Sequence, residues 1–192
     1  MTAVKQSILN KNRKDKFLLV LNLPDVIKGI NKTDQADRDS TYVNQDALQY
    51  SIYGTVVPDT SIPAVELGFA GQVVPVTSYN RPAWAPITVN FTVDNMFSNW
   101  WVLWKWLDLI NDSYKGTFNA KGLKDPNWKF DDSYTTNVTV FGLDEYNRQK
   151  IQFDYTHVLI TGLGGITYNY RDPDQIESTF TFSFGQFLPK LL

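Results

Sequence analysis

A two-residue alternation of apolar and polar side chains runs through several segments of the chain. It is clearest over 87–93 (ITVNFTV) and over 179–184 (TFTFSF). Side chains of a β-strand point alternately to its two faces, so this pattern predicts strands with one buried and one polar face. The same period marks 47–57, 138–140 and 151–155, and the turn residues 144–147 separate the last two. The chain is therefore expected to consist mainly of strands.

Two further segments are apolar without a clean alternation. Residues 17–23 (FLLVLNL) form a continuous apolar run that stops at Pro24. Its length and flanks predict a central strand with both faces covered. Residues 62–76 contain Pro63 and Pro75, which favours an edge or irregular extended segment because proline cannot donate a ladder hydrogen bond.

One segment has the period of a helix. Over 96–111 the residues that share one face are Met96, Trp100, Leu103, Trp104, Leu107 and Ile110, with Trp101, Val102, Trp106 and Leu109 on the flanks. Asp94 and Asn95 precede this segment and are candidates for its N-cap. The apolar stripe is wider than one sheet contact needs. We therefore expect the helix to pack on the core, with a flank left for a neighbouring molecule.

The chain is expected to form one domain over residues 1–192. The polar segments outside the predicted elements are an N-terminal arm at 1–16 and loops at 28–46 and 112–134. The predicted fold class is mainly β, a β-barrel or sandwich with one flanking amphipathic α-helix.

Composition excludes several kinds of site. The chain has no cysteine and a single histidine, so disulfides, zinc–cysteine sites and thiol catalysis are ruled out. His157 and Asp154 are three residues apart on a predicted strand and would point to opposite faces, which disfavours a catalytic relay. The formal net charge is -2, so bulk charge does not attract nucleic acid or an anionic membrane. We expect no enzyme, no cofactor, no metal and no membrane span.

The polar faces of the predicted strands are rich in threonine, serine, asparagine and glutamine. Such an uncharged face suits a wall past which something slides, and it is also common on plain β-sandwiches. Unpaired strand edges template association with other chains. Neighbouring copies in a ring would satisfy those edges.

Four features occur in the order found in one known family. They are the apolar strand at 17–23, the segment 61–71 (SIPAVELGFAG), the segment 84–95 (WAPITVNFTVDN) directly followed by the tryptophan-rich helix, and closing strands with glycines at 162–165 and phenylalanines at 180–184. In this order and spacing the chain resembles the tail tube proteins of contractile-tailed bacteriophages over roughly residues 17–188.

The resemblance implies a structural virion protein rather than an enzyme. Subunits of that family form hexameric rings that stack into a hollow tube inside a contractile sheath, and double-stranded DNA passes through the lumen without specific binding. The implied partners are further copies of the chain and the tail sheath and baseplate proteins. The implied location is the virion tail, assembled in the host bacterial cytoplasm. The candidate core and interface residues are those of the helix (Trp100, Leu103, Trp104, Leu107, Ile110), and the candidate lumen-facing residues are Gln152, Asp154 and Thr181.

Other functions remain open at this point. A baseplate or tube-initiator paralogue, or the inner tube of a related contractile injection system, is close to the first interpretation. A carbohydrate-binding β-sandwich module would place Trp84, Trp128 or Tyr168 in an exposed row on one sheet face. A hydrolase would need two acidic residues across a cleft, and no carboxylate stands out on an apolar strand face.

Overall fold

The computed structural model describes residues 11–24, 27, 51–110, 134–171 and 173–192. Most of the expected N-terminal arm, the whole 28–46 loop and nearly all of the 112–134 loop lie outside the described residues.

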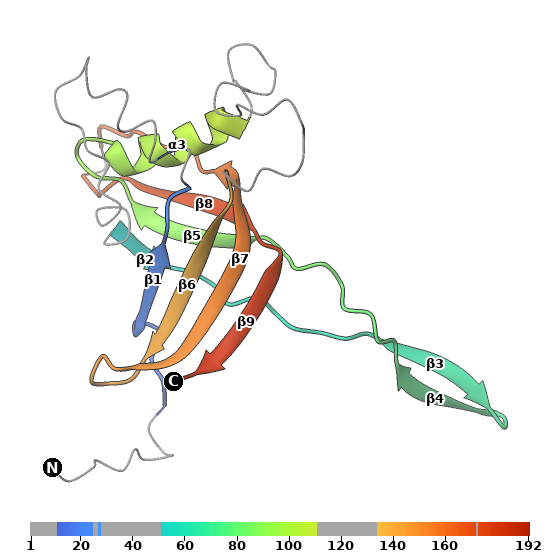
Figure 1. Ribbon diagram of the computed structural model, residues 1–192. Coiled ribbons are helices and arrows are strands. Elements are labelled where there is room, and N and C mark those ends of the chain that lie inside the picture. The colour runs from blue at the N-terminus through green and yellow to red at the C-terminus, as the bar shows by residue number, and fades with distance from the viewer. Residues whose placement is uncertain (1–10, 25–26, 28–50, 111–133, 172) are drawn as a thin grey trace, which may run out of the picture.

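Seven strands form one antiparallel sheet that curls into a nearly closed barrel (Figure 1). They are β1 (Phe17–Leu21), β2 (Ile52–Gly54), β5 (Ile87–Thr92), β6 (Thr136–Leu143), β7 (Gln149–Leu163), β8 (Glu177–Ser183) and β9 (Gln186–Leu191). The order is β1-β6-β7-β8-β5-β2, and β9 pairs with β7 beside β8. The helix α3 (Ser98–Ile110) lies over the body and is the one helix whose full extent falls within the described residues. The predicted class, mainly β with a barrel-like sheet and a flanking helix, is confirmed.

Strand β7 turns the sheet from one side of the barrel to the other. Its first part pairs with β6 and β9, and its last part pairs with β8. Between the two parts His157 has a φ of 52°, and the register with β6 shifts between Thr136 and Val138. A bulge of this kind bends a strand and adds one residue to it. The buried positions therefore change parity, from Tyr155 before the bulge to Val158 after it.

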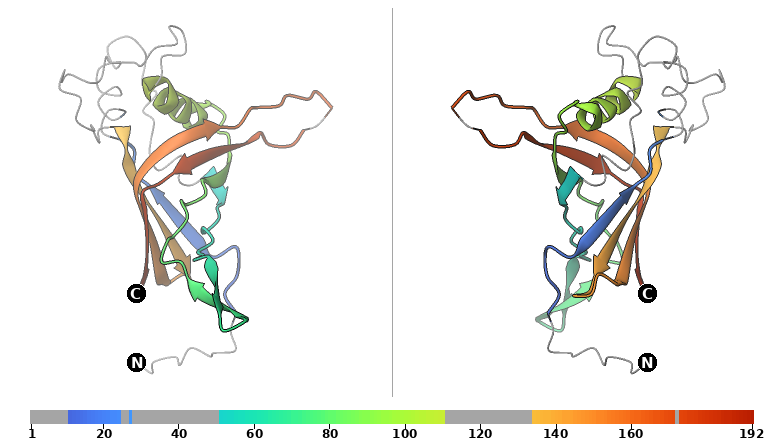
Figure 2. Two further views of the ribbon diagram at one scale, coloured as in Figure 1. Left: turned by 90° about the vertical axis from the view of Figure 1, so that its right-hand side faces the viewer. Right: turned by 90° about the vertical axis from the view of Figure 1, so that its left-hand side faces the viewer.

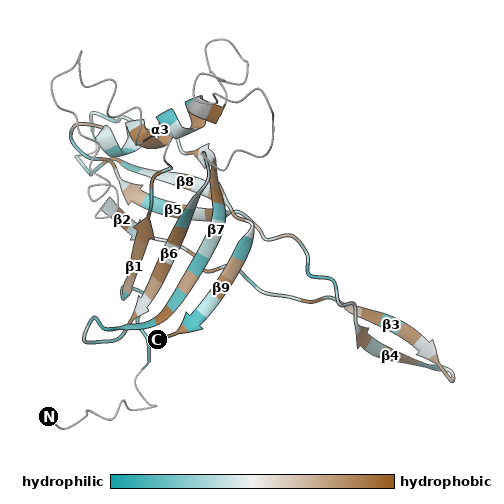
Figure 3. Cartoon of the chain, in the orientation of Figure 1, coloured by the Kyte–Doolittle hydropathy of each residue, from teal (hydrophilic) through white to brown (hydrophobic). Residues whose placement is uncertain are grey.

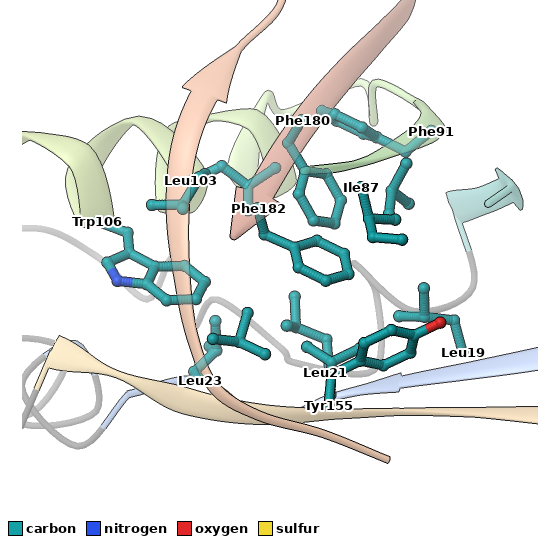
Figure 4. Packing of buried hydrophobic residues seen from close by; sticks show 14 of the residues in the cluster. Leu19, Leu21, Leu23, Ile87, Phe91, Leu103, Trp106, Tyr155, Phe180 and Phe182 are labelled. Carbon is teal, nitrogen blue, oxygen red and sulfur yellow. The ribbon is translucent and has the colours of Figure 1, made fainter. Parts of the chain in front are cut away.

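The core lies between the sheet and the helix (Figure 4). Figure 4 shows Leu103 and Trp106 of α3 facing Phe182 of β8 and the leucines on and after β1. Phe180 and Phe182 are each 1% exposed, as their alternation with threonine and serine predicts. Aromatic side chains pack against one another in this core, and the Tyr155 ring lies edge-on to the Phe182 ring with 5.7 Å between ring centres.

The prediction of a central strand at 17–23 is wrong. Strand β1 stands at one end of the strand order, and within the described residues it pairs only with β6. Leu19 and Leu21 are buried, whereas Leu18 on the opposite face is 41% exposed. A continuous apolar run identifies a strand, but it does not reveal whether the second face is covered by the same chain.

The Asp94 side chain caps the N-terminus of the helix from four residues ahead of its first residue, Ser98. The Asp94 carboxylate accepts hydrogen bonds from the backbone N–H groups of Ser98 at 2.8 Å and Asn99 at 3.2 Å. This confirms the capping role predicted for Asp94. The helix begins at Ser98 rather than 96, so Met96 precedes it and is 71% exposed instead of contributing to the apolar face.

A separate hairpin projects from the body (Figure 1). It consists of β3 (Ala64–Phe69) and β4 (Gln72–Thr77), which pair only with each other among the described strands. Its turn residues Ala70 and Gly71 have φ values of 51° and 79°, the left-handed conformation of a type I′ turn. The sequence predicted an edge or irregular extended segment here. It missed the turn because alanine rarely adopts that conformation.

Candidate assembly surfaces

The hairpin carries an apolar face that its own chain does not cover. In its register Val65 lies opposite Val76, and Leu67 lies opposite Val74. Every residue of both strands is exposed, and Phe69 at the tip is 75% exposed. We call the side chains that share this side the hairpin apolar face: Val65, Leu67, Phe69, Val74 and Val76. Figure 3 shows the corresponding hydrophobic stretches on β3 and β4.

An isolated two-stranded hairpin is at best marginally stable in water. No residue of β3 or β4 belongs to the buried core cluster or to the partly buried residues packed against it. Contiguous exposed apolar surface on a protein generally marks an interaction site. The hairpin is therefore a candidate contact with another molecule.

The helix packs on the core, but its face is rotated from the predicted one. Leu103 is fully buried, and Trp100, Leu107 and Ile110 are partly buried against the core. Val102 and Trp106, expected on the flanks, are fully buried. Trp104 is half-buried and is not among the residues of this cluster.

A buried polar residue explains the rotation. Asn99 is 1% exposed and donates a hydrogen bond to the Thr92 carbonyl at 2.9 Å, which holds this turn of the helix against β5. Trp106 likewise donates its indole N–H to the Tyr134 carbonyl at 2.9 Å. Hydrophobicity alone ranks the tryptophans equally. Asn99 precedes Val102 by three residues and Leu103 by four, so all three lie on one side of the helix. That spacing is the sequence signal that could have identified the buried side.

The opposite face of the helix combines tryptophan with charge. Trp101 is 40% exposed, and Lys105 lies 5.8 Å from the centre of the Trp104 ring. Lys105 also forms an ion pair with Asp108 at 3.1 Å. Residues 101, 104, 105 and 108 follow helical spacing, so they share one side of α3.

The structure separates the three lumen-facing candidates. Gln152 and Asp154 lie together on the outer face of the first part of β7, where the Gln152 amide donates to both Asp154 oxygens at 2.8 Å. The Thr139 hydroxyl donates to the same carboxylate at 2.8 Å. Thr181 lies instead on the outer face of β8, with its hydroxyl 3.4 Å from that of Thr88. The candidates therefore belong to two different faces of the barrel.

The acidic residues in the turn between β6 and β7 have a structural role. The Asp144 carboxylate accepts the backbone N–H of Arg148 at 2.8 Å and that of Tyr146 at 2.9 Å. These hydrogen bonds, that of Arg148 first, hold the pKa of Asp144 below its usual value. Within the described part of the chain, no three His, Asp or Glu side chains are grouped as metal ligands.

The aromatic row expected of a carbohydrate-binding module is not formed by Trp84 and Tyr168. Trp84 is half-buried, packs 5.5 Å from Phe187 between ring centres, and is capped by Arg81 at 5.4 Å. Tyr168 is 72% exposed on the long connection between β7 and β8, which projects from the body in Figure 2. The third residue, Trp128, lies outside the described residues.

Over the same described ranges, the structure has no helix of the length and apolarity needed to cross a bilayer.

No protein-family model and no curated protein matches the sequence. Similar folds do occur among solved structures. A chain of the anti-feeding prophage cap (the AFP tube terminating cap) is 10% identical with a TM-score of 0.58, and the match covers 100% of both chains. A chain of the sheath-tube complex of the extracellular contractile injection system PVC, in its extended state, is 9% identical with a TM-score of 0.57, again over 100% of both chains.

A chain of the sheath/tube terminator of the same PVC system is 9% identical with a TM-score of 0.58, covering 96% of this chain and 99% of the other. At these identities the likeness is one of fold. The resemblance predicted from the sequence is thereby confirmed at the level of architecture: the chain has the fold found in the tube and tube-terminating assemblies of contractile injection systems.

Proposed function

We propose that this chain is a non-catalytic structural subunit of the inner tube of a contractile tail. Copies associate into hexameric rings, the rings stack, and the stack encloses a lumen through which double-stranded DNA passes. The further partners are the tail sheath and the baseplate. The protein acts in the virion tail after assembly in the host bacterial cytoplasm.

The observation that carries this proposal is the exposed hairpin apolar face. The barrel has a core to which the hairpin contributes nothing, so these residues do not stabilise their own domain. The extended connections hold the hairpin away from the body, beyond contact with its own sheet (Figure 1). Their own apolar residues, such as Val56 and Ile62, are 62% and 52% exposed. An arm that reaches outward with an apolar face suits contact with a second copy.

Such a contact is heterologous, because the arm of one copy meets a different surface of the next. Heterologous contacts generate rings when the rotation closes and open filaments when it does not. The closing outcome gives the rings implied by the resemblance, and stacking of those rings gives the tube. The matching fold in a sheath-tube complex supports the same conclusion.

The fold does not separate a tube subunit from a tube terminator, because chains from both kinds of assembly match equally well. A baseplate or tube-initiator paralogue would share the fold too. The difference lies in stacking: a tube subunit polymerises beyond one ring, whereas a terminator or initiator stops.

Electron microscopy of the purified, concentrated full chain tests the proposal. Hollow tubes of uniform diameter are the expected result. Single rings that never stack would assign the chain to a terminator or initiator instead. A monodisperse monomer at high concentration that binds an oligosaccharide would overturn assembly and favour the carbohydrate-binding module.

A further inference from the structure

The two outward faces of the barrel differ in chemistry. One is formed by β5 and β8, whose register places Thr88 opposite Thr181 and Asn90 opposite Thr179. We call it the threonine face. Its residues alternate with the buried side chains of both strands, and they are Thr88, Asn90, Thr92, Thr179, Thr181 and Ser183.

Glycines border the threonine face on both sides. Gly54 of β2 pairs with Asn90, and a Cβ placed on Gly54 would lie 2.9 Å from the Asn90 amide nitrogen. Gly164, just after β7, donates its N–H to the Thr179 carbonyl, and a Cβ there would lie 2.6 Å from the Thr179 hydroxyl. A side chain at Gly164 would press on the Thr179 backbone, and one at Gly54 would displace the end of the Asn90 side chain, so glycine keeps both borders of the face free of larger groups.

The threonine face also lacks positive charge. Strands β2, β5 and β8 contain no lysine or arginine. Their one carboxylate, Glu177, stands at the end of β8 and accepts a hydrogen bond from the Tyr53 hydroxyl at 2.8 Å. This contact is the first cause of the raised pKa of Tyr53.

The second outward face, formed by β1, β6, β7 and β9, is mixed. One cross-strand row contains Leu18, Phe141, Gln152 and Lys190, and the next contains Val20, Thr139, Asp154 and Leu188. Leu18 is 41% exposed and Leu188 52% exposed. Exposed leucines in two neighbouring rows give this face apolar surface of the kind that contact with another protein covers.

We propose that the threonine face is the wall of the lumen and that Gln152 and Asp154 face away from the channel. The inference rests on the proposed tube. A lysine or arginine on the wall would attract the phosphates of passing DNA and retain it, whereas small hydroxyl and amide groups keep a layer of water between wall and polymer. The threonine face meets that requirement, and the mixed face, with Lys190 and exposed leucines, does not.

Single cysteines test the inference cleanly, because the chain has none of its own. Thr181→Cys places a thiol on the threonine face. Thr139→Cys is the matched control, a threonine at mid-strand on the mixed face. Each variant is treated, as free chain and as assembled tube, with N-ethylmaleimide and with a maleimide coupled to a protein too wide to enter the lumen.

The inference predicts a split for Thr181→Cys. In tubes this thiol reacts with N-ethylmaleimide, which diffuses in through the ends, and is protected from the wide reagent, while the free chain reacts with both. Thr139→Cys shows no such split, because its thiol faces either open solvent or a neighbouring subunit. Thr88→Cys, opposite Thr181 on β5, repeats the measurement if Thr181→Cys does not assemble.

Three other outcomes overturn the inference. Equal reaction of Thr181→Cys with both reagents in tubes places the threonine face outside, and protection from both places it in a subunit contact. A split at Thr139→Cys assigns the lumen to the mixed face. Failure of the unmodified chain to form rings or tubes is a different result, since it rejects the proposed function and the lumen with it.

Discussion

The barrel and the β3–β4 hairpin both contain large apolar side chains, but the barrel buries them and the hairpin exposes them. In the barrel, Phe182 and its neighbours are buried and closely packed, with ring separations near 6 Å such as 5.9 Å between Phe91 and Phe180. In the hairpin, Leu67 and Phe69 are 51% and 75% exposed. Both regions are antiparallel β-structure, and in both of them apolar side chains share one face.

This difference shows that the apolar residues of one chain belong to two interfaces. Those of the barrel stabilise the fold of the single copy. Those of the hairpin contribute nothing to it and are available to a neighbour. Substitutions in the barrel are therefore expected to change folding, and substitutions in the hairpin to change assembly alone.

The largest effect is expected for Phe182→Asp. Removing a buried phenylalanine side chain costs about 3–5 kcal/mol, and an unpaired buried carboxylate adds several more. Because a domain is stable by only about 5–15 kcal/mol, the variant should not fold. Circular dichroism of the purified protein checks this. Thr181→Asp, one residue away on the outward face, should remain folded, and a folded Phe182→Asp would reverse the assignment of the two faces of β8.

The second prediction concerns the hairpin. Leu67→Asp should leave the thermal unfolding midpoint of the barrel unchanged, because the hairpin does not contact the core, yet it should abolish rings and tubes. Thr77→Asp adds the same charge to the other face of the hairpin and should still assemble. Calorimetry and electron microscopy measure the two effects. Normal tubes from Leu67→Asp would remove the hairpin from the interface.

A smaller effect is expected where the barrel is tightly packed. In the variant Gly164→Ala, the added Cβ would approach the Thr179 hydroxyl to 2.6 Å and the Thr179 backbone nitrogen to 3.0 Å. Overpacking of this kind costs about 1–3 kcal/mol, which lowers the midpoint by about 2–4 °C per kcal/mol in a domain of this size.

Gly165→Ala is the adjacent control, since a Cβ there meets nothing within 4 Å. Thermal denaturation measures the unfolding midpoints of Gly164→Ala, where the new Cβ meets close neighbours, and of Gly165→Ala, where it meets none. Equal midpoints would mean that β7 and β8 are less tightly joined at Gly164 than the contacts indicate.

The smallest effect is expected at the helix cap. Asp94→Ala removes the acceptor for the N–H groups of Ser98 and Asn99. Loss of such a cap costs about 1 kcal/mol. Asp94→Asn retains an acceptor and should recover much of the loss in urea denaturation. A variant with unchanged stability would show that the buried Asn99 alone anchors the helix.

Much of the barrel could be predicted because alternation reports burial directly. Strands β5 and β8 follow the alternating segments, and Asp94 caps the helix as its position implied. The bulge at His157 could not be predicted, since it depends on the pairing of β7 with strands distant in sequence. The place of β1 at the end of the sheet likewise depends on distant pairing, whereas the hairpin turn was missed because Ala70 adopts a left-handed conformation that is rare for alanine.

The candidate sites were less predictable than the fold. Gln152, Asp154 and Thr181 all occupy polar positions of alternating strands, so periodicity treats them alike. The bend of β7 places the first two on one face of the barrel, while Thr181 lies on the other. The helix face was misplaced by a single position because hydrophobicity could not rank Trp104 against Trp106.

The central claim is that copies of this chain associate and cover the hairpin apolar face. Sedimentation velocity of the full chain over a range of concentrations tests this claim most directly. The account predicts that the boundary of the single 22.0 kDa chain gives way to ring-sized and larger species as concentration rises. Leu67→Asp should keep the single-chain boundary throughout. A full chain that sediments as a monomer at every concentration would contradict the account.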